Sequence, residues 1–309
     1  MLDTAKFRTY NQFLINYFLN CDLLKWVSET DNLKYNDDEV IQTKKVKEYK
    51  GIIFFFYHNR LEIIFKFHYY FNNSQHNAND FSVIDCINVV KEFRDIFDID
   101  LSLLAVINLE FGVNFLSPIR AIYLISYMIY HDKNAFRNDA GLSYSIRSFK
   151  DRKDGTANKY KTIKAYIKSL QFPKYCEPDT CRFEIASKEA KYIKQLGINS
   201  AKDLLNLEVY LKMEEKIKEE FDNVLILDCE TDFTSLTDIE QRKIADYNNP
   251  LKWFHILNNP YRNHFSKQKE IYYKFVNKIE NNLRNQLIKI ISDKLDFLKR
   301  GAISTTPKV

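Results

Sequence analysis

Three segments of the chain carry polar side chains at every second position, which is the pattern of a β-strand with one polar face. The polar residues are Asn108, Glu110 and Asn114 in 108–115, Lys164, Tyr166 and Lys168 in 163–168, and Arg182 and Glu184 in 181–185. Apolar residues fill the positions between them. If the three strands lie in one sheet, their polar faces would place carboxylates, a tyrosine and cationic groups side by side.

Such a set of residues could cut a phosphodiester bond. Glu110 and Glu184 would bind Mg²⁺ or Mn²⁺, which prefer oxygen ligands and would polarise the phosphate. Tyr166 would be the nucleophile and would keep the bond energy in a phosphotyrosine link. Because a free phenol has a pKa of about 10, Lys168 or the metal would have to favour the phenolate. Arg182 would bind the phosphate through paired hydrogen bonds.

The residues alone leave a second interpretation open. Half-buried antiparallel strands alternate simply because one face meets solvent. The chain also contains 20 tyrosines, so one tyrosine near a lysine is weak evidence of a nucleophile.

The elements that would position these residues follow from local patterns. Strands are expected at 51–57 and 61–70, around a turn at 58–60, and at 103–115, 160–168 and 181–186. Helices are expected from Asp80 to about Phe97, from Ser117 to His131, from Ser187 to Gly197 and from Ser200 to Phe221. The order predicts an α+β fold, an antiparallel-rich sheet with packed helices. We expect an N-terminal helical segment over 1–48, an α+β catalytic domain over 49–236 and a helical, basic C-terminal region over 237–309.

Composition supports a folded protein that binds an acidic partner. Of the 309 residues, 45% are hydrophobic and 15% aromatic, which excludes global disorder. The net charge is +5, and residues 266–300 contain nine Lys/Arg against four Asp/Glu. A helix of this kind suits a phosphate backbone, with Lys267 and Lys274 as candidate contacts; a solvated amphipathic helix is an equally good interpretation.

Five scattered cysteines and no apolar leader or membrane span favour a reduced, cytoplasmic location.

Five segments, in order, resemble the replication proteins of filamentous-phage gene II/X type, which are related to the rolling-circle initiators of plasmids. They are Phe67–Asn72 with Asn79–Phe81, similar to "LHKYFN…NDF"; Leu109–Phe115, similar to "LEFGVNI"; Ile163–Gln171, similar to "IKIYDKGKQ"; Arg182–Ile185 with Gly197–Ile198, similar to "LRFEIKV…KGI"; and Asn249–Trp253, similar to "NPxxW". The resemblance covers roughly 61–278. Asn108 stands where the family usually has an arginine, and Ile167 where it usually has an aspartate.

The resemblance implies a metal-binding role for Glu110 and makes Tyr166 the nucleophile, with Lys168 beside it. It also implies a place near the site for His68, as a metal ligand or an acid–base group. A strand histidine hydrogen-bonded at the sheet edge is an equally good interpretation of His68.

The leading hypothesis is therefore a DNA replication initiator, an endonuclease that nicks and rejoins origin DNA in rolling-circle or phage replication. Its partner would be the origin of a plasmid, phage or mobile element, and Asn108, Asn114 and Lys164 join the two helix lysines as candidate DNA contacts. A host helicase is a further candidate partner, and the oligomeric state is not predicted. The alternatives are an origin-binding protein without chemistry and a helical scaffold that binds no nucleic acid.

Overall fold

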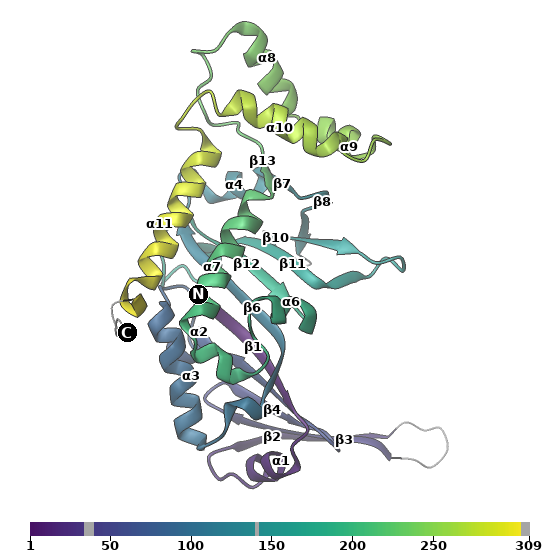
Figure 1. The fold of residues 1–309 in the computed structure, drawn as a ribbon, viewed down its shortest axis with the longest axis vertical. Coiled ribbons are helices and arrows are strands. Elements are labelled where there is room, and N and C mark those ends of the chain that lie inside the picture. The colour runs from purple at the N-terminus through teal and green to yellow at the C-terminus, as the bar shows by residue number, and fades with distance from the viewer. Residues whose placement is uncertain (34–39, 140–141, 304–309) are drawn as a thin grey trace.

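A ten-stranded antiparallel sheet runs through the protein (Figure 1). The computed structural model describes residues 1–33, 40–139 and 142–303. The strand order is β2-β3-β4-β5-β1-β6-β12-β11-β10-β9, and β13, β7 and β8 form a small second sheet. Helices pack on the large sheet and continue beyond it. The expected α+β class with an antiparallel-rich sheet is confirmed.

The strands are β1 (Leu2–Thr9), β2 (Lys25–Leu33), β3 (Val40–Tyr49), β4 (Ile52–Phe56), β5 (Leu61–Lys66), β6 (Ala105–Leu116), β7 (Met128–His131), β8 (Asn134–Ala135), β9 (Arg137–Asp139), β10 (Leu142–Asp151), β11 (Ala157–Ile167), β12 (Thr180–Ser187) and β13 (Val224–Ile226). The α-helices are α1 (Gln12–Leu19), α2 (Phe67–Phe71), α3 (Val83–Phe97), α4 (Ala121–Tyr127), α5 (Lys168–Gln171), α6 (Ala190–Gln195), α7 (Leu207–Asp222), α8 (Asp238–Tyr247), α9 (Pro250–Leu257), α10 (His264–Val276) and α11 (Leu283–Ile303). Two short 3-10 helices, Leu101–Leu103 and Ala201–Leu205, complete the described elements.

The main core lies between the apolar face of the sheet and the helices α3, α7 and α11, which run along that side (Figure 1). This core includes four residues of β6: Leu109, Phe111, Val113 and Phe115. The centroids of the Phe115 ring and the Phe221 ring of α7 are 6.5 Å apart. Period-two alternation therefore assigns the opposite face of β6 to Asn108, Glu110 and Asn114.

The expected helical segment over 1–48 is wrong. Within its described residues only α1 is helical, and the rest includes the strands β1, β2 and β3. β1 pairs with β5 on one side and with β6 on the other, so it lies in the middle of the sheet. Ala5 and Phe7 point into the core and Lys6 and Arg8 point the other way, so long-range pairing decides the structure of this segment.

Several element ends also differ from the expectations. The 83–97 helix begins after Ser82 rather than Asp80, because Ser82 and Asp85 form a capping box. The chain from 67 to 71 is helical instead of continuing the strand. The helix expected from Ser117 to His131 covers only 121–127 and is followed by β7. The helix expected from Ser187 has Glu189 at its N-cap, and the strand β10 was not expected.

The region after 237 is helical, as expected, but its helices join two different cores. Trp253 and Tyr272 are fully buried in a second core that α8, α9 and α10 build against β7 and β13. The helix α11 instead returns to the main core and packs on α3, α7 and β6. No described helix is both long enough and apolar enough to cross a membrane.

Gly112 allows β6 and β12 to approach at the polar face. A Cβ at this position would lie 2.2 Å from the carbonyl oxygen of Phe183 and 2.8 Å from the Cα of Glu184. We expect Gly112→Ala to reduce the free energy of unfolding by about 3 kcal/mol, because backbone atoms of β12 would have to move. Urea denaturation measures this change. Gly301→Ala is the control, since the nearest atom to its Cβ position is Ile84 Cγ2, at the ordinary contact distance of 3.5 Å; an equal loss in both variants would contradict the explanation.

Candidate functional site

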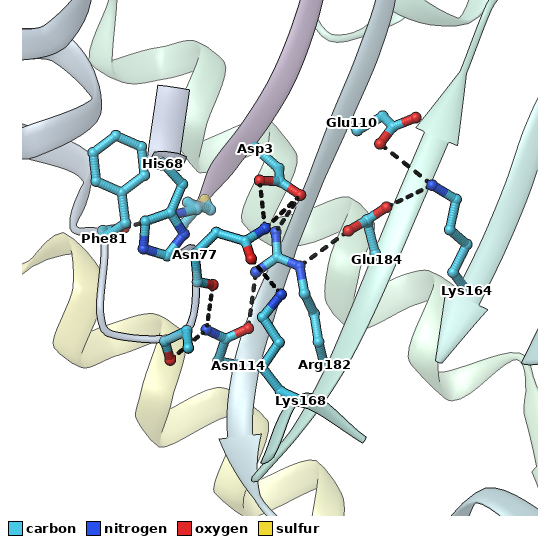
Figure 2. A network of polar contacts seen from close by, with 12 residues as sticks. Asp3, His68, Asn77, Phe81, Glu110, Asn114, Lys164, Lys168, Arg182 and Glu184 are labelled. Atoms are coloured by element: carbon cyan, nitrogen blue, oxygen red, sulfur yellow. Dashed lines mark hydrogen bonds and ion pairs between the residues drawn. The ribbon is translucent and has the colours of Figure 1, made fainter. Parts of the chain in front are cut away.

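The three strands expected to carry polar faces are neighbours in the sheet, with β12 between β6 and β11. Tyr166 lies opposite Arg182, which lies opposite Asn114. In the next row Lys164 lies opposite Glu184. Paired positions on adjacent strands share a face, so these side chains meet on the face that the core does not use. Figure 2 shows Asn114, Lys164, Arg182 and Glu184 there.

Glu184 is the centre of the resulting network. Its carboxylate accepts hydrogen bonds from Lys164 Nζ at 2.8 Å, from Arg182 Nε at 3.0 Å and from the Tyr166 hydroxyl at 3.2 Å. Lys164 Nζ also lies 3.3 Å from Glu110 Oε2 and joins the two glutamates. Figure 2 shows Lys164 between them. Lys164 is 20 residues from Glu184 and 54 residues from Glu110 in the sequence, so only the folded sheet creates this contact.

A third carboxylate completes the group. Ligand oxygens of Asp3, Glu110 and Glu184 lie within 4.8 Å of one another. Asp3 comes from the start of β1, and Asn77 Nδ2 donates to its Oδ1 at 3.1 Å. Three carboxylates this close fit a hard divalent cation. They would bind it in competition with the ammonium group of Lys164, which already contacts two of them.

Ionisation in this group reflects burial and charge. Burial, followed by the charge of Glu184, raises the pKa of Glu110. Burial opposes ionisation of Asp3, but Arg182 and Asn77 outweigh it and the pKa of Asp3 is lowered. Burial and the Glu184 carboxylate raise the pKa of Tyr166 well above its usual value. In the absence of an added cation, the phenol therefore keeps its proton and donates a hydrogen bond to Glu184.

Arg182 is held inside the network. Its residue is only 2% exposed, its Nη1 donates to Asn114 Oδ1 at 2.9 Å, and its Nη2 lies 3.5 Å from Asp3 Oδ2. Nη2 makes no hydrogen bond within the described part of the chain. The guanidinium therefore neutralises the carboxylates of Asp3 and Glu184, and its Nη2 is left without an acceptor for a hydrogen bond among the described residues.

Lys168 is fully buried beside Tyr166. Its Nζ donates to Asn77 Oδ1 at 2.5 Å and to Gln171 Oε1 at 2.8 Å, and it lies 5.1 Å from the centroid of the Tyr166 ring. Burial and the charge of Arg182 lower the pKa of Lys168 to about 7. The ammonium therefore faces the ring and titrates near neutral pH.

This lowered pKa makes stability depend on pH. Between about pH 7 and the pKa of about 10.4 of an unfolded lysine, the unfolded chain binds the proton and the folded chain does not. The free energy of unfolding should rise with pH there, by up to about 1.4 kcal/mol per unit, and this stabilisation is lost as the pH falls through 7. In Lys168→Met, the free energy of unfolding from urea denaturation should rise less steeply between pH 7 and pH 9.5. An unchanged dependence on pH would contradict the lowered pKa of Lys168.

His68 lies at the edge of the network, outside the group of three carboxylates. It is 2% exposed, its ring stacks on Phe81 with centroids 4.8 Å apart, and its Nε2 is 2.8 Å from Asn79 Oδ1. Burial, with the positive charges of the N-terminus and Arg182, lowers the pKa of His68 to about 2. The imidazole is neutral, and its Nδ1 makes no hydrogen bond within the described residues.

The remaining candidate residues lie in different places. Asn114 is buried and donates to the carbonyl of Ala78 at 3.0 Å, so it anchors the loop that follows α2. Asn108 is half-buried on the same face of β6, opposite Lys6 of β1. Lys267 and Lys274 are exposed on α10, which packs in the second core away from the sheet.

Asp3 and Asn77 belong to the network but were not predicted from the sequence. Asp3 lies in the segment expected to be helical, and Asn77 in a polar loop. Simple alternation would put Asp3 on the core face with Ala5 and Phe7. The pairing of β1 with β6 shifts register between Leu2 and Thr4, and this irregularity interrupts the alternation at Asp3. No local pattern identifies Asn77, because its partners Asp3 and Lys168 are 74 and 91 residues away.

A second group of possible metal ligands lies elsewhere, at His131, Asp132 and Glu220. Lys161 Nζ already contacts both carboxylate oxygens of Glu220, at 2.7 and 2.8 Å, and His131 Nε2 lies 2.8 Å from Oε2. The group contains no tyrosine, and we treat it as a buried ion pair of α7.

No family model and no curated protein matches the chain. Among solved structures, it is similar to a rolling circle replication initiator protein from Geobacillus stearothermophilus, with 11% sequence identity and a TM-score of 0.41. The similarity covers 80% of this chain and 96% of that chain.

Proposed function

We propose that the protein is a DNA replication initiator that nicks and rejoins origin DNA with Tyr166 as the nucleophile. The observation that carries this proposal is the hydrogen bond from the Tyr166 hydroxyl to Glu184, at 3.2 Å, inside a group of three carboxylates. A nucleophile needs a base within hydrogen-bond reach, and Glu184 Oε2 meets that requirement.

The reaction uses these groups in order. The Tyr166 oxygen forms a bond to the phosphorus, its proton passes to Glu184, and the bond from phosphorus to the 3′ oxygen breaks. That oxygen takes a proton from water and becomes a 3′ hydroxyl, which can prime synthesis. Rejoining reverses the three changes, because the phosphotyrosine bond keeps the phosphate in an activated ester.

The other residues position these reacting groups. Asp3, Glu110 and Glu184 would hold Mg²⁺ or Mn²⁺, which when bound polarises the phosphate and favours the phenolate. Lys164 keeps Glu110 and Glu184 together, and the free N–H groups of Arg182 Nη2 bind a phosphate oxygen. Lys168 covers the Tyr166 ring and restricts its motion.

A specific observation favours the second candidate, an origin-binding protein without nicking activity. Lys164 and Arg182 already neutralise the carboxylates, and the pKa of Tyr166 is raised. In that case the same network would only stabilise the sheet, and no divalent metal would yield a covalent product.

Nicking of supercoiled DNA from the protein's own replicon, with Mn²⁺ and then with EDTA, separates the two candidates. We expect nicked circles that retain protein after denaturation, and their loss in EDTA. Glu110→Gln should reduce nicking at least about 100-fold, because a ligand is lost. Glu215→Gln, an exposed acid on α7, is the control and should nick normally. Tight DNA binding with no nick in any metal would favour the second candidate.

A further inference from the structure

A second polar cluster lies on the same sheet face, in β1 and at the start of β5. Glu62 is buried, with 4% of its side chain exposed, and three cations converge on it. Arg8 donates to Oε1 from Nη2 at 2.6 Å and from Nε at 2.9 Å, Arg60 Nε donates to the same oxygen at 3.3 Å, and Lys6 pairs with Oε2. We call Lys6, Arg8, Arg60 and Glu62 the β1–β5 cluster.

This cluster carries more positive charge than its carboxylate neutralises. Three cations around one carboxylate leave a net charge of +2. The cationic side chains are 27%, 34% and 27% exposed, so solvent reaches N–H groups that Glu62 does not use. Burial opposes ionisation of Glu62, but Lys6 and Arg8 outweigh it and lower its pKa. The fixed carboxylate therefore orients the cations and leaves them able to bind an anion.

Two aromatic rings, Phe55 and Tyr57, lie beside the β1–β5 cluster. Phe55 is opposite Glu62 in the sheet and is half-buried, and Lys44 Nζ lies 4.3 Å from its centroid. The Arg60 guanidinium lies 4.1 Å from the centroid of the half-buried Tyr57 ring. Cations interleaved with accessible rings are typical of surfaces that bind single strands, where the cations contact phosphates and the rings stack on bases.

The cluster and the candidate nicking site share one continuous face. Thr4, Lys6 and Arg8 alternate with the core residues Ala5 and Phe7, and Thr4 pairs with Glu110. The helices α3, α7 and α11 lie on the other face of the sheet (Figure 1). From strand spacing and rise, Lys6 lies about 25 Å from Tyr166, and Glu62 about 35 Å. Nothing in the candidate reaction uses it.

We infer that the β1–β5 cluster binds the single-stranded DNA that flanks the nick, with Lys6, Arg8 and Arg60 on phosphates and Tyr57 and Phe55 against bases. This inference rests on the proposed function, because it assumes a nicking site on the same face of the sheet. It deepens that function by assigning the substrate as a single strand that extends across the sheet from Tyr166 to β5.

Fluorescence anisotropy with a labelled oligo-dT strand, over a range of NaCl concentrations, tests this inference without any cleavage. The test variant is Lys6→Gln/Arg60→Gln, because Arg8 remains to pair with Glu62 and preserve the fold. We expect about a tenfold loss of affinity and a decrease of about 1.4 in the slope of log affinity against log salt, since each phosphate contact on a single strand contributes about 0.7. Tyr57→Leu should weaken binding without changing this slope.

The control is Lys91→Gln/Lys202→Gln, which removes the same charge from exposed positions on the helical side of the molecule. It should bind within twofold of the original protein. Equal effects in the two double variants, or stronger binding to duplex than to oligo-dT with the cluster intact, would overturn the inference. The nicking assay distinguishes failure of the inference from failure of the proposed function. Salt-sensitive binding through the cluster with no nick would refute the proposed function alone. Normal nicking, together with unchanged oligo-dT affinity in Lys6→Gln/Arg60→Gln, would refute the inference alone.

Discussion

Tyr166→Phe is expected to abolish covalent attachment of the protein to DNA while leaving the fold and DNA binding in place. Phenylalanine has no oxygen that can bond to phosphorus, so the covalent product should fall by at least about 1,000-fold, a loss of the kind seen when a nucleophile is removed. The lost hydroxyl makes one hydrogen bond, to Glu184, so the free energy of unfolding should change by only about 1 kcal/mol. Denaturing gels of nicked circles measure the product.

Tyr160→Phe is the matched control for this variant. Tyr160 lies on the same strand, β11, and its hydroxyl donates to Gln195 at 3.0 Å. It should attach to DNA as the original protein does. Undiminished attachment in Tyr166→Phe would refute Tyr166 as the nucleophile, and equal losses in both variants would indicate a general effect on β11.

Glu184→Gln should be the most destabilising of the conservative changes at the site. The residue is 2% exposed and accepts hydrogen bonds from Lys164, Arg182 and Tyr166. Loss of its charge leaves Arg182 buried with a weaker set of acceptors, which costs about 3 kcal/mol. Nicking should be lost at the same time, because the base next to Tyr166 is gone. Urea denaturation and the nicking assay measure the two effects.

Glu189→Gln provides the comparison for stability. Glu189 lies 3.7 Å from Arg152, and both side chains are more than 40% exposed, so the change should stay within about 0.5 kcal/mol. A loss below about 1 kcal/mol in Glu184→Gln would contradict the view that this carboxylate holds the network together.

The central part of the site could be predicted from sequence because alternation is a local property. Glu110, Tyr166 and Glu184 each stand out against apolar neighbours on their own strand, and the structure brings these strands together as neighbours. The roles of Tyr166 as nucleophile, Lys168 as its cation and Arg182 as a phosphate contact remain predictions. So do the metal, the DNA contacts and the domain boundaries.

The rest depended on contacts between distant segments. The strand β1 has only eight residues and contains Asp3, Thr4, Lys6 and Arg8, so its sequence shows little apolar periodicity until its pairing with β5 and β6 is known. The ion pair of Lys164 with Glu110 joins strands that are not adjacent, with β12 between them. The burial of His68 depends on Phe81, in the loop before α3. Local patterns contain none of this information.

The most direct test of the proposed function is to locate the tyrosine that carries the DNA. The covalent product of the Mn²⁺ reaction would be digested with nuclease and trypsin, and the peptides analysed by mass spectrometry. The proposed function predicts a nucleotide adduct on the peptide Ala165–Lys168, which contains Tyr166 as its only tyrosine. An adduct on a peptide with a different tyrosine would contradict it.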